Sequence, residues 1–195
     1  MFELKGKSAV ITGGGSGIGK AISVLFAKRG AAVHIIELNQ EAAAKTVEEI
    51  ASEGGSAFSY SCDVSNQQQV IETFNKIGKI DILINNAGIA HVGKVDTTSE
   101  ADFERVDNVN ANKGGVILNT ASIASHVGIT DRFAYSMSKG AIFAMTMSVA
   151  RDYLHDNIRC NSISPARIHT PFVDAFIAKK YPGQADEIFD KLSKR

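Results

Sequence analysis

The chain has 195 residues, 44% of them apolar and 22% charged, and its 21 basic residues balance its 21 acidic ones. This length allows one domain with a proper hydrophobic core and is too short for two, so we expect residues 1–195 to form a single domain. A formal net charge of zero argues against nucleic acid or an anionic membrane as the main partner.

The two cysteines, Cys62 and Cys160, lie far apart in strand-like patterns and have neither the spacing of a disulfide framework nor that of a metal site. They are expected to be buried free thiols in a reducing compartment. No apolar run approaches the roughly 18–20 residues that span a bilayer, and the N-terminus lacks the apolar region of a signal peptide. These features predict a cytoplasmic protein without a membrane segment.

Short apolar or β-branched runs alternate with helical patterns along the chain. The first helical pattern stops at Gly30, and the second begins at a candidate N-cap, Asn39, and stops at Gly54. Such alternation predicts a doubly wound, Rossmann-like α/β fold, a parallel sheet with helices on both faces. The predicted strands are 8–12, 31–37, 57–62, 80–85, 115–120 and 158–163.

A glycine cluster, "TGGGSGIG", stands where the first strand ends and the first helix begins. Gly13, Gly17 and Gly19 allow a tight turn that aims backbone N–H groups and the positive end of a helix dipole at one point, which suits a pyrophosphate. An ordinary strand-to-helix turn is the alternative.

Glu37 ends the second predicted strand, 18 residues after Gly19. A carboxylate at this place accepts hydrogen bonds from ribose hydroxyls and repels a 2′-phosphate. Residues 13–18, which include Ser16, contain no basic side chain that could hold a 2′-phosphate. The pattern therefore favours NAD over NADP, unless Glu37 is only a solvated strand end.

Later motifs follow the strands in the same way. "CDV" (62–64) and "NNAG" (85–88) close the third and fourth strands, and the carboxyl ends of strands bind ligands in doubly wound sheets. Tyr135 and Lys139, in "YSMSK", are spaced to share one face of a helix. A Tyr-x-x-x-Lys pair is common by chance, so its meaning depends on the motifs around it.

In order and spacing, "TGGGSGIG", Glu37, "CDV", "NNAG", "NVN", Ser122 and "YSMSK" resemble the short-chain dehydrogenases/reductases. Ser122 precedes Tyr135 by 13 residues, the interval of that family. "SPARIHTP" (164–171) resembles the family's Pro-Gly loop, with Ala166 in place of the usual glycine. The resemblance runs from Lys7 to about Pro171.

The resemblance implies transfer of a hydride between a secondary alcohol and a nicotinamide. Tyr135 would be the general base for oxidation and the general acid for reduction, and Lys139 would favour its phenolate and hold the nicotinamide ribose. Ser122 would hydrogen-bond the substrate oxygen, and Asn110 would position a relay water. Packing, surface or strand-end roles are the plain alternatives for these four residues.

The resemblance also implies which residues bind NAD. Arg167 and His169 are candidate substrate contacts, whereas His91 and His126 are interpreted as loop residues, and no spacing suggests a metal site. The implied cofactor-binding residues are Gly13, Gly15, Ser16, Gly17, Ile18, Gly19, Glu37, Asp63, Val64, Asn86, Ala87, Gly88, Tyr135, Lys139, Ile168 and Thr170.

The function predicted first is that of an NAD-dependent oxidoreductase acting on a small alcohol or ketone, such as a sugar, polyol or hydroxy acid. The segment "SPARIHTPFV" resembles sugar dehydrogenases of the family that act on fucose-like sugars. The alternatives are a 3-oxoacyl thioester reductase and a nucleotide-binding protein without turnover. The family resemblance further implies a homotetramer.

The sequence departs from the family pattern in three places. Between Asp63 and Asn85 it is about four residues shorter, and the chain ends without the family's last strand. Only four residues separate Asn110, at the catalytic edge of the expected sheet, from Gly115 at the opposite edge, and a returning helix cannot fit there. Either residues are missing from this sequence or a deletion has removed the helix, part of the expected subunit interface. We expect a break in the Cα spacing within 110–115 and another near Ile77–Gly78; unbroken spacing at both would favour a damaged, inactive domain.

Overall fold

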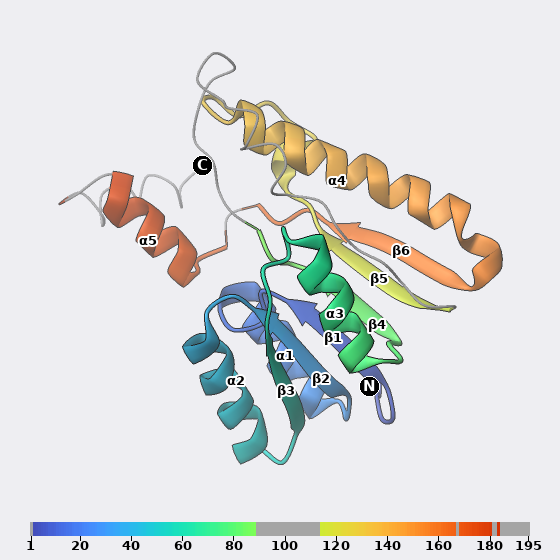
Figure 1. Cartoon of the computed structure of the whole chain (residues 1–195). Coiled ribbons are helices and arrows are strands. Elements are labelled where there is room, and N and C mark those ends of the chain that lie inside the picture. The colour runs from blue at the N-terminus through green and yellow to red at the C-terminus, as the bar shows by residue number, and fades with distance from the viewer. Residues whose placement is uncertain (1, 89–113, 167, 181–182, 184–195) are drawn as a thin grey trace.

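The computed structural model describes residues 2–88, 114–166, 168–180 and 183, and its core is a parallel six-stranded sheet with helices on both faces (Figure 1). The strand order is β3-β2-β1-β4-β5-β6. This arrangement confirms the predicted doubly wound α/β fold. The strands are β1 Ser8–Thr12, β2 Ala32–Glu37, β3 Ser56–Ser61, β4 Ile82–Asn85, β5 Gly115–Thr120 and β6 Ile158–Ile163.

Two of the helices begin at asparagine side chains that cap them. Asn39 caps the second helix by accepting a hydrogen bond from the N–H of Ala42 at 3.1 Å, and Asn66 caps the third in the same way from Gln69. The helices are α1 Gly17–Lys28, α2 Gln40–Ser52, α3 Gln67–Ile77, α4 Phe133–Asp152 and α5 Pro171–Lys180, with short 3₁₀ helices η3 Ile123–Ser125 and η4 Leu154–Asp156.

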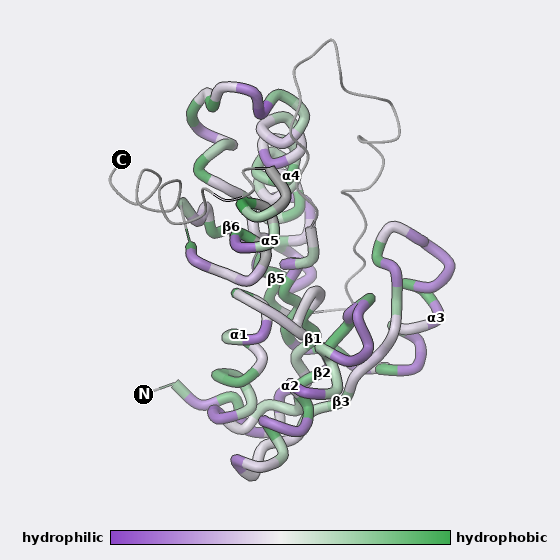
Figure 2. The backbone as a smooth tube through the Cα atoms, turned by 90° about the vertical axis from the view of Figure 1, so that its left-hand side faces the viewer, coloured by the Kyte–Doolittle hydropathy of each residue, from purple (hydrophilic) through white to green (hydrophobic). Residues whose placement is uncertain are grey.

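Two apolar clusters hold the layers together. One lies between the sheet and helices α1 and α2 and includes the fully buried Ile11, Ile35 and Ile50. The other lies on the opposite face, under α3 and α4, and includes Val10 and Leu83. Because parallel strands are covered on both faces, their residues are apolar with little alternation, and the hydrophobic stretches accordingly follow the inner strands (Figure 2).

The parallel register brings the candidate motifs to one edge of the sheet. Thr12 pairs with Ile36, and Asn85 pairs with Asn119. The ends of β1, β2, β4 and β5 therefore lie side by side at their carboxyl edge, where the glycine-rich loop, Glu37 and the "NNAG" segment begin.

The expected break near Ile77–Gly78 is absent, and that prediction is wrong. Helix α3 runs unbroken to Ile77, and the N–H of Gly78 donates to the carbonyl of Phe74 at 2.9 Å. Gly78 adopts φ +78°, a conformation that closes a helix readily only with glycine. The connection is thus a shorter helix that still packs Val70 and Phe74 onto the sheet.

Asn110 and most of the second range, 110–115, lie within 89–113, outside the described residues. Strand β5 does start at the amino edge, because the N–H of Gly115 donates to the carbonyl of Asn157 and that of Val116 to Asp81. Among the described residues, no helix is long and apolar enough to cross a bilayer.

Candidate active site

The glycine-rich loop turns sharply between β1 and α1. Gly13 and Gly17 have φ angles of +66° and +51°, which side-chain-bearing residues rarely adopt. A Cβ on Gly13 would lie 3.0 Å from the Cα of Ala87, and one on Gly19 would collide with the carbonyl oxygen of Gly13. Ser16 precedes α1 without capping it through its side chain. The Ser16 side chain therefore leaves the first amide groups of α1, which include that of Ile18, uncapped, and the amino end of a helix suits an anion.

Glu37 lies next to this loop. Its Oε2 accepts a hydrogen bond from the N–H of Gly15 at 3.2 Å, and its Oε1 accepts from Leu38 at 3.0 Å and Asn39 at 3.2 Å. Three backbone donors thus fix the carboxylate at the end of β2, where the sequence places the ribose contact.

The "NNAG" segment is tied to the end of β1 by Thr12. The hydroxyl of Thr12 accepts from the N–H groups of Asn86 and Ala87, both at 3.0 Å. The side chain of Asn86 donates to the carbonyl of Thr12 at 3.2 Å. Thr12 was not among the predicted site residues, although it opens the "TGGGSGIG" motif.

Asp63 and Val64 lie just beyond β3. The carboxylate of Asp63 accepts from the N–H and hydroxyl of Ser65 at 2.9 and 2.7 Å, so it organises the turn into α3. Val64 packs against the core under α3. Both residues lie at the same carboxyl edge of the sheet as Glu37, and both are partly exposed.

Ser122 follows β5 and caps the short helix η3. Its buried hydroxyl accepts from the N–H of Ala124 at 3.2 Å. The pairing of β5 with β6 continues past the strands, because the N–H of Ala121 donates to Ile163 and that of Ile123 to Pro165. The hydroxyl is therefore held by its own turn, and the backbone on either side of Ser122 is held by β6 and the loop after it.

Tyr135 and Lys139 lie one turn apart in the first half of α4, which packs against η3. The Nζ of Lys139 donates to the carbonyl of Thr120 at 2.7 Å. A Cβ on Gly88 would lie 3.9 Å from this Nζ, so Lys139 also reaches the "NNAG" segment. Desolvation by burial lowers the pKa of Lys139.

A buried polar chain links β4, β5 and α4 beneath these residues. The side chain of Asn85 donates to Asn119 at 2.7 Å, and Asn119 donates to the hydroxyl of Thr146 at 2.9 Å. Asn119 is 2% exposed. The role of Asn119 was not predicted. The signal in the sequence was a polar residue inside an otherwise apolar strand.

The loop before α5 carries the last predicted residues. Thr170 lies beside the glycine-rich loop, since a Cβ on Gly17 would be 3.3 Å from its Cγ2. Ile168 is 48% exposed, and His169 contacts Asp174 at 2.7 Å. Arg167 lies outside the described residues.

His126 lies near Ser122 in the chain but bonds elsewhere. Its Nε2 is 3.0 Å from the hydroxyl of Ser164, and its ring meets that of Phe143 edge-on. His91 lies outside the described residues, and within the described part no group of three or more His, Cys, Asp or Glu side chains could hold a metal ion.

A sequence model of the family described as "short chain dehydrogenase" matches residues 7–180. The chain belongs to the short-chain dehydrogenase family. An uncharacterized oxidoreductase of Thermotoga maritima is 37% identical, over all of this chain and 84% of that protein. The 7alpha-hydroxysteroid dehydrogenase of Escherichia coli K12 is 36% identical over 90% of this chain and 76% of that protein.

Solved structures of the family have the same fold. A 7alpha-hydroxysteroid dehydrogenase complexed with NADH and 7-oxo glycochenodeoxycholic acid is 36% identical, with a TM-score of 0.83 over 98% of this chain and 82% of that one. L-sorbose reductase from Gluconobacter frateurii, complexed with NADPH and L-sorbose, is 25% identical, with a TM-score of 0.87 over 97% of this chain and 81% of that one. The short-chain dehydrogenase described here is therefore an oxidoreductase acting on hydroxyl or keto groups.

The comparison with the Thermotoga protein also bears on the length of the chain. That alignment runs over 212 positions whereas this chain has 195 residues, so at least 17 positions of the relative lack a counterpart here. The alignment covers the whole chain, so the shortfall is internal. It agrees with the internal shortening that the sequence indicates.

Proposed function

We propose that this short-chain dehydrogenase uses NAD to oxidise a secondary alcohol, or NADH to reduce the matching ketone. The carboxylate of Glu37, held by the N–H of Gly15 at 3.2 Å beside the glycine-rich loop, is the observation that carries the choice of cofactor. The glycines supply a cradle that a Cβ would fill at Gly13 and Gly19. These residues fit a dinucleotide whose pyrophosphate lies on the amino end of α1.

The charges around Glu37 support NAD over NADP. A 2′-phosphate at the ribose would meet the carboxylate as a like charge. The two lysines that line the pocket on the α2 side of Gly15 are paired, Lys20 with Glu49 at 2.6 Å and Lys45 with Glu41 at 2.7 Å. Binding NADP would therefore require a new cation or the breaking of these pairs.

When bound, the nicotinamide supplies the hydride acceptor or donor, and the protein supplies the proton and the charge. Tyr135 takes the proton of the alcohol or returns it to the ketone oxygen. Lys139, anchored to Thr120, places its cation one turn from Tyr135 and favours the phenolate. Ser122 is proposed to hydrogen-bond the substrate oxygen, and Asn110, outside the described residues, stays the predicted support of a relay water.

The substrate is proposed as a small alcohol or ketone, with sugars, polyols and hydroxy acids as the first candidates. The relatives' names extend the range to test: steroids through the 7alpha-hydroxysteroid dehydrogenase and ring alcohols through the cyclohexanol dehydrogenase of Acinetobacter sp.. A 3-oxoacyl thioester and a protein without turnover are the alternatives. A panel with NAD and NADH, covering these classes, distinguishes them, because binding without any turnover would favour the last.

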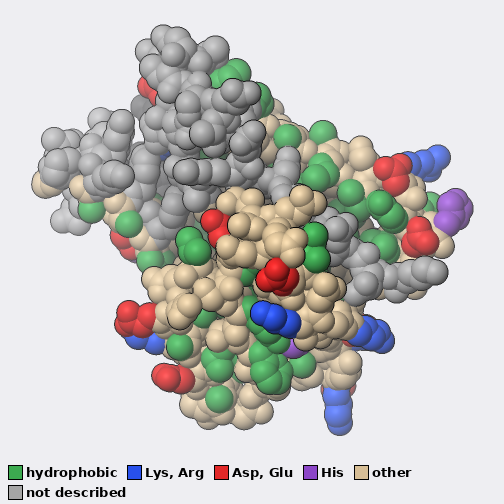
Figure 3. Space-filling view, in the orientation of Figure 1, with side chains coloured by type: hydrophobic (Ala, Val, Ile, Leu, Met, Phe, Trp, Pro, Cys, Tyr) green, Lys and Arg blue, Asp and Glu red, His purple; other side chains and the backbone are tan. Residues whose placement is uncertain are grey.

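We further propose that the protein is cytoplasmic and forms homotetramers. Exposed apolar side chains on α4 and the residues after it are the surface that supports self-association, and hydrophobic atoms are visible over this helix (Figure 3). They include Phe133, Met137, Met147, Tyr153 and Leu154. The mass in solution, measured by light scattering, tests the assembly, and a monomer at micromolar concentration would overturn it.

The cofactor assignment is tested by titrating NADH and NADPH into the protein and its Glu37→Gln variant. The parent should bind NADH at least tenfold more tightly, and the variant should lose most of that preference, since tenfold is about 1.4 kcal/mol. Glu48→Gln, an exposed position on α2, is the matched control and should keep the preference. Equal affinities in the parent would rule out the role of Glu37.

A further inference from the structure

The Glu37 carboxylate is directed by the loop beside it. Two of its three hydrogen bonds come from Leu38 and Asn39, its own neighbours, and both end on Oε1. Only the N–H of Gly15 reaches Oε2. The orientation of the Glu37 carboxylate relative to the glycine-rich loop therefore depends on where Gly15 lies.

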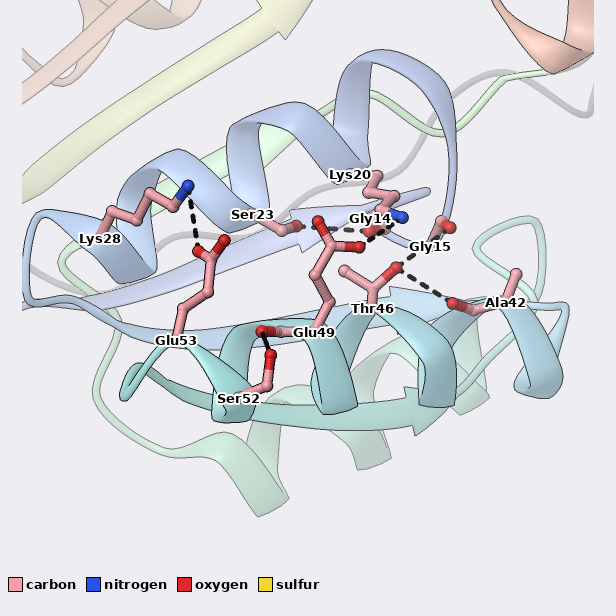
Figure 4. A network of polar contacts seen from close by, with 10 residues as sticks. All are labelled: Gly14, Gly15, Lys20, Ser23, Lys28, Ala42, Thr46, Glu49, Ser52 and Glu53. Atoms are coloured by element: carbon pink, nitrogen blue, oxygen red, sulfur yellow. Dashed lines mark hydrogen bonds and ion pairs between the residues drawn. The ribbon is translucent and has the colours of Figure 1, made fainter.

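Gly15 is held in turn by helix α2. The hydroxyl of Thr46 donates to the carbonyl of Gly15 at 3.2 Å and shares its hydrogen with the carbonyl of Ala42 at 3.1 Å (Figure 4). The Thr46 side chain has no exposed surface. A Cβ on Gly15 would lie 3.0 Å from the N of Ala43 and from the Glu37 carboxylate. Gly15 is therefore closely packed between helix α2 and the Glu37 carboxylate.

The neighbouring peptide group has a second anchor. The hydroxyl of Ser23, also fully buried, donates to the carbonyl of Gly19 at 3.0 Å and lies 3.4 Å from the carbonyl of Gly14. The carbonyl of Gly14 belongs to the same peptide group as the N–H of Gly15. Ser23 on α1 and Thr46 on α2 thus contact the glycine-rich loop from two helices, as Figure 4 shows.

We propose that Thr46 is a positioning residue for cofactor selection: its hydroxyl holds Gly15, and Gly15 holds the Glu37 carboxylate at the ribose site. This inference rests on the proposed use of NAD. Thr46 touches neither cofactor nor substrate, and it acts through the loop. Ser23 is the weaker second support of the same peptide.

The test is the ratio of NADH to NADPH affinity in the variant Thr46→Val. Valine keeps the shape but leaves the buried Gly15 carbonyl without its donor, so Gly15 and Glu37 lose their fixed geometry. We expect the ratio to fall about fivefold, in keeping with the net loss of one hydrogen bond, and kcat at saturating NADH to change less than twofold. Thr46→Ser retains the hydroxyl and should restore the parental ratio.

If Thr46 had only a structural role, Thr46→Val would lower the stability of the fold without changing the ratio of NADH to NADPH affinity. The matched control is Thr73→Val, a buried threonine on α3 that bonds to Cys62 and lies away from the loop. It should lower the midpoint of urea unfolding while the affinity ratio stays parental. Should Thr46→Val not fold, Ser23→Ala serves in its place and is expected to lower the ratio about twofold.

The outcomes separate this inference from the proposed function. A parent with no preference for NADH overturns the proposed cofactor. A parent that prefers NADH, with Thr46→Val or its substitute keeping the full preference, overturns the role of Thr46 alone. A fall in the ratio in Thr46→Val that Thr46→Ser reverses supports both.

Discussion

The Nζ of Lys139 lies 2.7 Å from the carbonyl oxygen of Thr120, so the end of strand β5 anchors the cation of helix α4. Burial lowers the pKa of this lysine. Its charged form is therefore less stable in the folded protein than in water. The family chemistry needs that charge close to Tyr135. This part of the candidate site is thus built at some cost to the stability of the fold.

Replacing Lys139 by Met should abolish most turnover and weaken NADH binding, because the cation and its ribose contact are both lost. The stability effect has a defined sign. Below the lowered folded pKa, the parent carries the full cost of a buried charge, and that cost disappears as the pH rises toward the ordinary lysine value. Urea unfolding should therefore show a variant that gains more stability relative to the parent at pH 7 than at pH 10.5. Lys76→Met, on the exposed face of α3, should show no such difference, and a variant gain that grew with pH would contradict the account.

Tyr135→Phe should bind NADH nearly as well as the parent but lose turnover by roughly 10²- to 10⁴-fold, because only the proton donor is removed. Steady-state kinetics with the best substrate of the panel measure this, together with a separate NADH titration. Tyr153→Phe, at the far end of α4 and 48% exposed, is the control. Near-normal kcat in Tyr135→Phe would mean that another group carries the proton.

Asp81→Asn should make the protein less stable at pH 7 but not in strong acid. The N–H of Ser8 and the cations of Lys7 and Lys79 lower the pKa of Asp81, with the Ser8 hydrogen bond as the largest cause. The stability from this carboxylate is present above its ordinary pKa, near 3.8, and is lost as the pH falls through its lowered folded value. Unfolding midpoints of parent and variant should converge toward pH 2. Parallel curves down to that pH would refute the assignment, and Asp152→Asn, on an exposed position, serves as the control.

Asn119→Leu should destabilise the protein by about 2–4 kcal/mol, because the half-buried side chain of Asn85 and the buried side chain of Thr146 each lose a partner. The same change at Asn161, an exposed position on β6, should stay within about 0.5 kcal/mol. Urea unfolding measures both. Similar losses at the two positions would show that the polar chain contributes little.

Much of the fold was predictable because a parallel sheet covered on both faces leaves a plain signal of apolar runs between amphipathic stretches. The boundaries moved by one or two residues, since pairing decides them: Cys62 falls beyond β3, and β4 begins at Ile82. The glycine-rich loop and Glu37 could be singled out because their pattern depends on local order along the chain, and the structure brings the two together. The break near Ile77–Gly78 was predicted wrongly, because a helix can lose a turn without leaving its place on the sheet.

What the sequence could not predict are contacts between distant segments. Thr12 meets Asn86 across 74 positions of the chain, and Thr46 meets Gly15 across 31. Each is a common residue in an ordinary helix or strand, and neither has a spacing that marks its role. Only the three-dimensional arrangement shows that the hydroxyl of Thr12 holds the "NNAG" segment and that the hydroxyl of Thr46 holds Gly15.

The strand order has a kinetic consequence. Strand β1 pairs with β2, whose residues follow 24 positions later, but also with β4, where Ala9 meets Ile82. Pairings between distant segments close large loops and form late in folding. The site straddles this β1–β4 boundary, with Glu37 on one side and Lys139 on the other. A refolding chain should therefore recover its helices and the β1–β2 pair before it can bind a dinucleotide, so activity is the last property to return.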